Sequence, residues 1–301
     1  MTKSVVTGAA GFIGSNLVEY LLNQGHEITC IDNESANNER FHWNGTTYNV
    51  NGDITDYKFM KNVFTGVDYV FHLAAQSRLQ PAIKNPVETV QKNCVGTTVM
   101  LQCAREAGAK RFIYSSTSSG YGNNPYPNVE TQLDDCLNPY SASKIAAEKF
   151  CKMYTDLYGL ETVVLRYFNV FGERSPTVGQ YAPVIGIFQQ QKRNGYPLTI
   201  VGDGSQRRDF VYVGDVARAN YLASIMPLIK DGHNYAGEVF NVGSGKNYSI
   251  KEIASAISES QVTIDERKGE MDTTLADITK IGKVIGWKPE VDVIDWIHGQ
   301  K

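Results

Sequence analysis

A turn punctuated by three glycines near the N-terminus constrains the fold more than any other feature of this sequence. Gly8, Gly11 and Gly14 follow a short apolar run and precede an amphipathic stretch. Glycines at this spacing let the backbone turn sharply, approach a pyrophosphate closely and pack the next helix against the strand. The first turn of that helix offers free N–H groups and a positive dipole end to phosphate. The motif therefore predicts a strand, a tight turn and a helix that bind a dinucleotide.

A carboxylate stands at the end of the second apolar run. This run covers residues 28–31, and Asp32 follows it, eighteen positions after Gly14. An acid at this place accepts hydrogen bonds from both hydroxyls of an adenine ribose and repels a 2′-phosphate. Because strand, turn, helix, second strand and acid occur in the order that a dinucleotide fold requires, we expect NAD rather than NADP as the cofactor.

Further apolar runs alternate with amphipathic stretches along the chain. Continuous runs of this length, separated by helices, are typical of a parallel sheet that is covered on both faces. We therefore expect an α/β fold with a doubly wound parallel sheet of the Rossmann type. The expected strands are residues 5–7, 28–31, 48–50, 69–72, 111–115, 163–166 and 239–242.

The composition changes after Arg166. Residues 168–181 are rich in Gly, Pro and Asn, and residues 196–212 contain Gly-Asp-Gly followed by two arginines. Such loops are typical of segments that face a ligand. We expect residues 1–165 to form the NAD-binding domain and residues 166–301 to form mainly a smaller C-terminal substrate-binding lobe. The expected strand at 239–242 would return the chain to the first sheet.

Composition and charge exclude several classes of function. The 301 residues carry a net charge of −3 and the sequence pI is about 6.0. Neither nucleic acid nor a membrane surface is therefore an expected partner, and no segment approaches the length of a transmembrane span. The five cysteines are scattered and lack metal-site spacing. We expect a cytoplasmic protein with reduced cysteines and without a metal site.

A tyrosine and a lysine are spaced for joint catalysis. Tyr140 and Lys144 are four residues apart in an expected helix, so their side chains share one face. A free phenol titrates near pH ~10, and an adjacent ammonium group stabilises its phenolate. Residues 114–122, rich in hydroxyl groups, follow an expected strand, and ligands bind at the carboxyl ends of strands in open parallel sheets. A hydroxyl there can pass a proton between a substrate oxygen and Tyr140.

Taken together, these motifs resemble those of the extended short-chain dehydrogenase/reductases, specifically the nucleotide-sugar epimerases and dehydratases. The resemblance covers almost the whole chain. The matching segments are residues 7–14, 52–54, 72–75, 116–117, 140–144, 166–172, 202–212 and 276–277.

The resemblance implies a role for each matched position. Tyr140 would be the catalytic base, Lys144 its partner and a ligand of the nicotinamide ribose, and Thr117 the hydroxyl near the sugar O4. Arg208 and Arg267 would clamp the diphosphate, as forked donors suit phosphate oxygens. The cofactor-binding residues would be Gly8, Gly11, Phe12, Ile13, Gly14, Asp32, Asn33, Asp53, Ile54, Leu73, Ala74, Ala75, Asn93, Ser115, Tyr140 and Lys144, with Asp53 and Ile54 at the adenine. The substrate-binding residues would be Ser116, Thr117, Tyr140, Asn169, Thr199, Val201, Arg208, Arg267 and Thr274.

Two serines after Thr117 indicate which reaction follows. Members of the resembled family first oxidise a sugar carbon, usually C4, and pass a hydride to NAD. Its dehydratases carry Asp-Glu after the active-site Thr, and its decarboxylases usually place a Glu two positions after it. This chain has Ser118 and Ser119. Without elimination chemistry the 4-keto sugar can only turn and take the hydride back, which predicts a 4-epimerase of a UDP-hexose.

Two alternatives stay open. A UDP-glucuronate 4-epimerase would need a cation for the C6 carboxylate, and the sequence offers no unambiguous one. A non-catalytic NAD-sensing relative of the same fold would usually lack the Tyr-Lys pair or the strand-end hydroxyl. This chain keeps Thr117, Tyr140 and Lys144, which argues against the non-catalytic alternative.

Substrate size and oligomeric state are two further expectations. In the resembled family, the position two before the Ala276-Asp277 pair lies beside the C2 substituent, and a Tyr there excludes an N-acetyl group. This chain has Thr274 at that position, so we expect UDP-GlcNAc and UDP-GalNAc to be interconverted, and UDP-Glc and UDP-Gal at comparable or lower efficiency. Two long apolar helices at 87–107 and 141–158 predict a homodimer.

Overall fold

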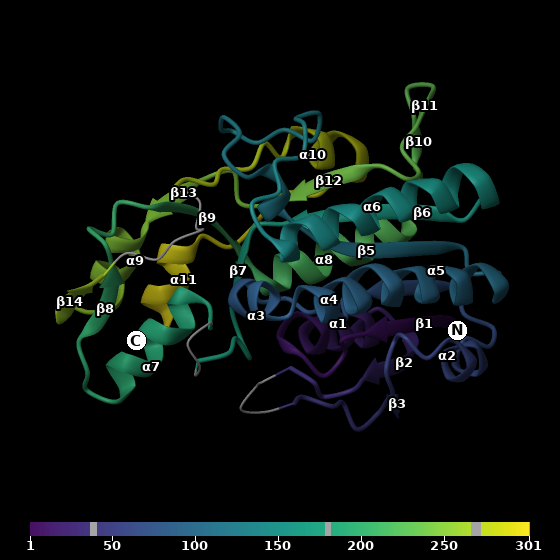
Figure 1. The fold of residues 1–301 in the computed structure, drawn as a ribbon, viewed down its shortest axis with the longest axis horizontal. Helices are drawn as coiled ribbons and strands as arrows, with labels where there is room; N and C mark the ends of the chain where they lie inside the picture. The colour runs from purple at the N-terminus through teal and green to yellow at the C-terminus, as the bar shows by residue number, and fades with distance from the viewer. Residues whose placement is uncertain (37–40, 178–181, 266–271, 301) are drawn as a thin grey trace.

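The computed structural model describes residues 1–36, 41–177, 182–265 and 272–300 (Figure 1). Its largest element is a sheet of seven strands: β1 (Thr2–Thr7), β2 (His26–Asp32), β3 (Tyr48–Asn51), β4 (Tyr69–His72), β5 (Arg111–Thr117), β6 (Glu161–Tyr167) and β12 (Val239–Val242). The strands are all parallel, in the order β12-β6-β5-β4-β1-β2-β3. The strand order reverses beside β1, and a crevice for a ligand forms at such a switch point.

Helices cover both faces of this sheet. Val5 and Val6 are neighbours in β1 but belong to different apolar clusters, because successive side chains of a strand point to opposite faces. The cluster of Val6 is covered by α1 (Phe12–Asn23), α8 (Val213–Ile225) and α10 (Thr279–Ile285). The cluster of Val5 is covered by α2 (Tyr57–Val63), α5 (Gly96–Glu106) and α6 (Pro139–Tyr158). The short helices α3 (Leu79–Lys84) and α4 (Pro86–Val90) lead into α5 through a π-helical turn, η1 (Gln91–Val95).

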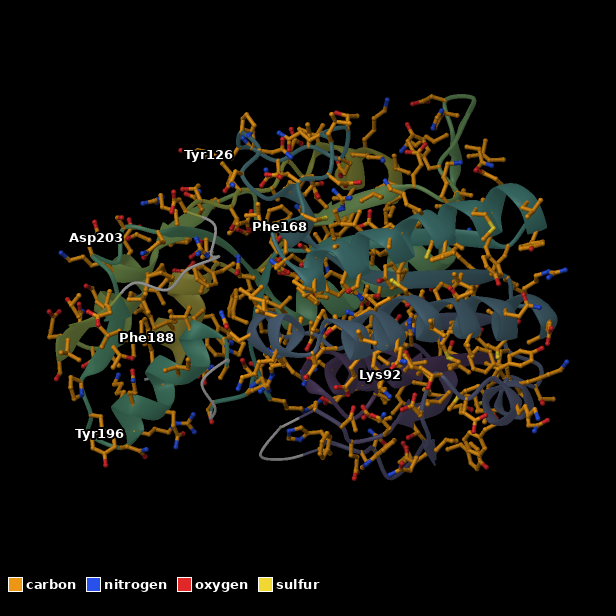
Figure 2. The ribbon with its side chains drawn as sticks, viewed as in Figure 1. Lys92, Tyr126, Phe168, Phe188, Tyr196 and Asp203 are labelled. Carbon is orange, nitrogen blue, oxygen red and sulfur yellow. The ribbon has the colours of Figure 1, made fainter. Side chains whose placement is uncertain are left out.

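A smaller lobe lies at one end of the large sheet (Figure 1). It contains a three-stranded sheet of β7 (Asn169–Phe171), β9 (Arg207–Tyr212) and β13 (Asn247–Ser249), and a parallel pair of β8 (Leu198–Val201) and β14 (Gln261–Ile264). Its helices are α7 (Val184–Arg193), α9 (Ile250–Ile257) and α11 (Val293–Gly299). Phe171, Phe188 and Phe210 are buried in its own apolar core, and Figure 2 shows Phe188 within this lobe.

The two lobes meet around Phe168, which lies between them in Figure 2. Its backbone N–H donates to the carbonyl of Val242 at 3.0 Å, and its ring lies 6.3 Å from that of Tyr121, centroid to centroid. The chain crosses from β6 into β7 here, and again from β12 toward β13. Residues at this junction can therefore face a ligand bound between the lobes.

The expected α/β fold is confirmed, and each of the seven expected strands lies in the large sheet. The strand expected at 239–242 is β12, which pairs with β6 and returns the chain to that sheet. The helix expected over 87–107 differs, since η1 divides it into α4 and α5. The helix expected over 141–158 is continuous but begins earlier, at Pro139. Among the described residues, no helix is long and apolar enough to cross a membrane.

Candidate functional site

The glycine turn after β1 leaves no room for side chains. Gly8 has a φ of +67°, a conformation that other residues rarely adopt. A Cβ on Gly14 would lie 2.0 Å from the carbonyl oxygen of Gly8, and a Cβ on Gly8 would lie 2.8 Å from the backbone nitrogen of Ala74. Gly11 precedes Phe12, the first residue of α1, and Ile13 follows within the first turn. This arrangement fits a pyrophosphate at the N-terminus of α1.

Asp32 ends β2 beside this turn. Its carboxylate accepts hydrogen bonds from the backbone N–H groups of Ala10 at 3.1 Å and of Glu34 at 2.9 Å. Burial raises the pKa of Asp32, and these two hydrogen bonds oppose that rise. The carboxylate is thus held at the carboxyl end of the sheet next to the glycine turn, as an adenine-ribose ligand requires.

Asp53 lies beside this corner and is held by a lysine that the sequence analysis did not identify. Lys92 forms an ion pair with Asp53 across 39 positions of the chain, and the amide of Asn33 donates to the same carboxylate at 3.1 Å. Burial raises the pKa of Asp53, but the bonds from Lys92 and Thr55 outweigh burial and hold it well below its usual range. Ile54, the next residue, is buried against Gly96 at the start of α5.

The segment after β4 is positioned by a buried row of polar side chains. The hydroxyl of Thr7 accepts from the backbone N–H groups of Leu73 at 3.2 Å and of Ala74 at 3.1 Å, and Ala75 follows. His72 bridges the hydroxyls of Thr7 and Thr97, with ring-nitrogen to oxygen distances of 2.7 and 2.9 Å. Burial lowers the pKa of His72 well below its usual value, so this histidine is neutral and structural.

Asn93 joins three parts of the site from within the π-helical turn η1. Its side chain is fully buried. The carbonyl oxygen accepts from the backbone N–H of Gln76 at 2.8 Å, and the amide group donates to the Gln76 carbonyl at 3.0 Å and to the Ser143 hydroxyl at 2.9 Å. Asn93 therefore ties the segment after β4 to helix α6, and its role as a direct cofactor ligand stays a prediction.

Helix α6 begins just before Tyr140 and Lys144, the expected catalytic pair. Asn138 caps the helix by accepting from the backbone N–H of Ser141 at 2.9 Å, with Pro139 in the first turn. Tyr140 therefore lies at the first turn of α6, and the Thr117 hydroxyl at the end of β5 is close enough to lower the pKa of its phenol. Two elements that are far apart in the sequence bring the expected base and the expected hydroxyl together.

Burial favours the uncharged forms of both Tyr140 and Lys144 and so moves their pKa values apart. It raises the pKa of the Tyr140 phenol, which the neighbouring Thr117 hydroxyl opposes. It lowers the pKa of Lys144 to about 7, against the negative charge of Glu148 one turn further along α6. The Lys144 ammonium lies 4.3 Å from the ring centroid of Tyr114. An ammonium beside a phenolate would oppose both shifts, because opposite charges stabilise each other.

Ser115 and Ser116 precede Thr117 but bind within the protein. The Ser115 hydroxyl shares a hydrogen bond of 2.8 Å with the hydroxyl of Tyr167. The Ser116 hydroxyl donates to Glu148 at 2.5 Å, and Glu148 is paired with the buried Arg166 at 2.7 Å. The expected contacts of Ser115 with the cofactor and of Ser116 with the substrate stay predictions.

The expected substrate residues Asn169, Arg208 and Thr274 come together in the smaller lobe, and we call them the substrate wall. The Asn169 amide donates to the Thr274 hydroxyl at 3.3 Å. The Arg208 guanidinium donates to the carbonyls of Arg207 and Asp272, both at 3.1 Å. Thr274 is 2% exposed, so its side chain is packed rather than projecting freely.

Two further expected substrate residues, Thr199 and Val201, do not belong to this wall. Thr199 and Val201 are in β8, where the Thr199 hydroxyl accepts from the side chain of Gln191 in α7 at 2.8 Å. Arg267 lies outside the described residues. Whether these side chains contact substrate stays a prediction.

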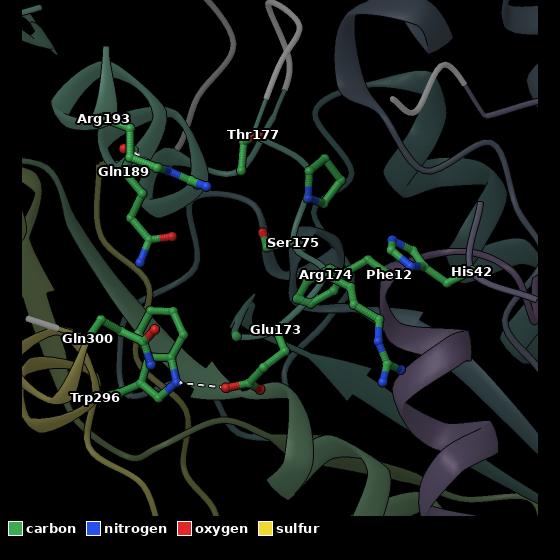
Figure 3. A pocket seen from close by; sticks show the side chains of 12 residues that line it. Phe12, His42, Glu173, Arg174, Ser175, Thr177, Gln189, Arg193, Trp296 and Gln300 are labelled. Atoms are coloured by element: carbon green, nitrogen blue, oxygen red, sulfur yellow. Dashed lines mark hydrogen bonds between the residues drawn. The ribbon is translucent and has the colours of Figure 1, made fainter. Parts of the chain in front are cut away.

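A pocket of about 340 Å³ lies between the glycine turn and the smaller lobe (Figure 3). Of the residues expected from the sequence, Phe12 lines it, together with Glu173, Arg174 and Trp296. Glu173 accepts from the Trp296 indole at 3.1 Å, the bond drawn in Figure 3. Arg174 is paired with Glu19 of α1. These bonds hold the lobe against α1, whose N-terminus faces the expected pyrophosphate.

Comparisons with known proteins agree with this geometry. The family model described as "NAD dependent epimerase/dehydratase family" matches residues 4–243. The UDP-glucose 4-epimerase of Thermotoga maritima, solved with UDP-glucose, superposes with a TM-score of 0.91 at 32% identity, covering 98% of this chain and 96% of its own. The UDP-N-acetylglucosamine 4-epimerase of Methanobrevibacter ruminantium M1, in complex with UDP-N-acetylmuramic acid, gives 0.89 at 33%, covering 100% and 99%. A UDP-glucuronate 4-epimerase of Thermodesulfobacterium geofontis is 32% identical over 96% of this chain and 92% of its own.

The chain belongs to the NAD-dependent epimerase/dehydratase family. It is an enzyme of the nucleotide-sugar 4-epimerase type, and its cofactor is NAD. The glycine turn, which a single Cβ would fill, and the carboxylate of Asp32 beside it fit this cofactor. The three relatives are named for three different sugars, so similarity at this level leaves the sugar open.

Proposed function

We propose that this enzyme inverts C4 of a UDP-hexose: UDP-GlcNAc and UDP-GalNAc, UDP-Glc and UDP-Gal, or both pairs. The observation that carries the proposal is that the fold brings Thr117, at the end of β5, next to Tyr140 in the first turn of α6, with Lys144 on the same helix. Ser118 and Ser119 follow Thr117 in place of the acids that elimination or decarboxylation requires. The site thus holds a base for oxidation at C4, and neither of the two residues that follow Thr117 is an acid.

The roles follow from the placement of the side chains. Tyr140 removes the proton of the sugar 4-hydroxyl, and Thr117 orients this hydroxyl or relays its proton. Lys144, charged below its pKa of about 7, stabilises the phenolate. NAD held at the glycine turn would supply hydride acceptance and return at C4. Turning of the 4-keto sugar presents the opposite face of C4 for that return, and Tyr140 gives the proton back to O4, so substrate and product differ only at C4.

We propose that Thr274 admits an N-acetyl group at C2. A threonine is much smaller than a tyrosine, and its hydroxyl is held by Asn169 in the substrate wall. An open pocket does not reject the smaller sugar, because a missing contact costs only about 1–3 kcal/mol. Both pairs of sugars are therefore expected as substrates, with the N-acetylated pair at equal or higher efficiency.

A panel of nucleotide sugars tests both statements. Purified enzyme, with its bound NAD and none added, is incubated with UDP-GlcNAc, UDP-Glc and UDP-glucuronate, and each reaction is followed to equilibrium by chromatography. Tyr140→Phe is the matched inactive control. We expect 4-epimers from UDP-GlcNAc and UDP-Glc. Turnover of UDP-glucuronate alone would contradict the choice of hexose, and a dehydrated or decarboxylated product would contradict the reaction.

We further propose a homodimer formed by α4 to α6. Val87, Val90 and Val95 are 72%, 46% and 49% exposed on the first part of this surface, and Leu157 of α6 is 66% exposed. Helix α6 packs against both α4 and α5, so these apolar side chains lie along one layer of helices that a second copy would cover. Light scattering should give a dimer for the wild type and a monomer for Val90→Glu with Leu157→Glu. Leu133→Glu, at a loop residue that is 86% exposed, is the control.

The redox state of the cysteines indicates in which cellular compartment the protein works. All five are free in the structure, which supports a reducing compartment and hence the cytoplasm. Fractionation of cells that express the protein at native level tests this assignment.

A further inference from the structure

Asp209 is a carboxylate of β9 with no exposed surface, and two distant segments bind it. One oxygen accepts from the backbone N–H of Ser244 at 2.6 Å and from the Ser244 hydroxyl at 2.8 Å. The other accepts from the backbone N–H groups of Gly245 at 3.1 Å and of Ala276 at 3.0 Å. The four donors are uncharged, so among the described residues this carboxylate is stabilised by directed hydrogen bonds rather than by an ion pair.

The backbone of Asp209 holds the substrate wall. Its carbonyl oxygen accepts from the Asn169 amide at 3.0 Å, and its N–H donates to the Thr274 hydroxyl at 3.1 Å. Arg208 is its neighbour in β9. Every member of the wall therefore contacts or adjoins residue 209, although the three lie on three different segments.

The carboxylate also joins the two lobes. Ser244 follows β12 of the large sheet, whereas Asp209 belongs to the three-stranded sheet of the smaller lobe. A Cβ on Gly243 would lie 2.9 Å from the Asp209 carboxylate and 2.6 Å from the Cβ of Ala276. The loop after β12 thus approaches the carboxylate so closely that no side chain fits between them. Burial raises the pKa of Asp209, and the four donors oppose the rise.

We propose that Asp209 is the positioning residue of the substrate wall: by fixing the loop after β12 and the segment through Ala276, it sets Asn169, Arg208 and Thr274 for a nucleoside diphosphate-sugar. The proposal rests on the assignment of these three residues to substrate under the proposed function. Asp209 touches neither the catalytic pair nor the glycine turn, so its effect falls on substrate binding and not on NAD or on proton transfer.

Asp209→Asn is the first test, because it keeps the shape but turns one acceptor into a donor that faces backbone N–H groups. We expect the Kd of UDP, measured by calorimetry on NAD-loaded enzyme, and the KM of the UDP-sugar to rise at least about tenfold, since an unsatisfied buried polar group is costly. We expect kcat to stay within about threefold and the bound NAD content to be unchanged. A merely structural role would instead lower the melting temperature and leave KM where it was.

Gly243→Ala is the second test, because its methyl group would push Asp209 and Ala276 apart. It should raise KM and the Kd of UDP as Asp209→Asn does. Gly299→Ala in α11, where a Cβ meets nothing within 4 Å, is the control and should leave all readouts unchanged.

The outcomes separate this proposal from the proposed function. A wild-type enzyme that binds no UDP contradicts the proposed function itself. A wild type that binds UDP, with folded variants whose Kd and KM are unchanged, overturns only the role of Asp209. If the variants lose kcat and bound NAD together with UDP affinity, the proposed role of Asp209 is overturned as well. If Asp209→Asn does not fold, Gly243→Ala decides by the same readouts, and failure of both to fold would assign residue 209 to stability alone.

Discussion

The residues expected to bind the cofactor and those expected to bind the substrate are brought together in different ways. On the cofactor side, the glycine turn and Asp32 lie within one strand-helix-strand unit at the start of the chain, and their backbone bonds are local. On the substrate side, Asn169, Arg208 and Thr274 come from segments that are tens of residues apart and meet around one buried carboxylate. A site formed within one short segment, such as the glycine turn with Asp32, depends on residue type at a few positions. A site formed by distant segments, such as the substrate wall, depends on how the lobes pack.

Loss of the proposed base Tyr140, or of its neighbour Thr117, should have the largest effect on activity. We expect Tyr140→Phe to lower kcat by about 10³–10⁴-fold, because the phenol oxygen is the base. Thr117→Ala should cost less, since Thr117 orients or relays a proton that Tyr140 holds. Steady-state kinetics with the preferred sugar measures both. NAD content and melting temperature should be unchanged in Tyr140→Phe; a variant that keeps a tenth of the wild-type rate would show that another base operates.

Burial of the Lys144 ammonium should lower the free energy of unfolding of the protein. Its folded pKa of about 7 lies below its ordinary value of 10.5, so the unfolded chain binds more protons between these two pH values. The cost of burying Lys144 is therefore fully present below pH ~7 and falls as the pH rises toward 10.5. We expect Lys144→Met to stabilise the NAD-free protein at pH ~6, on the order of 3 kcal/mol, and by much less near pH ~10.

Thermal unfolding of the NAD-free wild type and variant at these two pH values measures the effect. Lys152→Met, an exposed lysine of the same helix, is the control and should give no such pH-dependent gain. Equal midpoints for Lys144→Met and wild type at the lower pH would show that the lysine is not desolvated.

Thr274→Tyr tests the substrate wall. The larger ring should fill the space beside C2 and lower kcat/KM for UDP-GlcNAc by about a hundredfold while sparing UDP-Glc, because a pocket rejects a group for which it has no room. Thr274→Val is the matched control. It removes the hydroxyl that holds Asn169 and Asp209 but not the space, so it should weaken both sugars alike. If Thr274→Tyr epimerises UDP-GlcNAc as fast as the wild type, residue 274 does not determine which sugars fit.

Asp32→Asn tests the expected NAD site at the start of the chain and should have the smallest effect. Without the carboxylate, repulsion of a 2′-phosphate disappears, and the preference for NAD over NADP should fall by about tenfold. Competition binding of the two cofactors to NAD-free protein measures it. Glu27→Gln removes a carboxylate from the other end of the same strand and should leave the preference as it is. An unchanged preference in Asp32→Asn would mean that another group excludes NADP.

The sequence analysis was most successful where function depends on contiguous residues. The seven strands and the turn at Gly8 to Gly14 follow from apolar runs and glycine spacing, which are properties of neighbouring residues. It did not identify the ion pair of Lys92 with Asp53, since no local pattern relates residues 39 positions apart. It also missed the interruption of the helix over 87–107, where a π-helical turn places the side chain of Asn93 against Gln76 and Ser143.

The sequence by itself determined the fold class, the cofactor and the residues expected to perform proton transfer, because each depends on residue types at short spacings within single elements. Only the tertiary structure decided that Thr117 meets Tyr140, that burial brings the pKa of Lys144 to about 7, and that Asp209 gathers the substrate wall. Desolvation and long-range hydrogen bonds arise when elements pack, and a carboxylate such as Asp209 has the same letter in the sequence whether it ends buried or exposed.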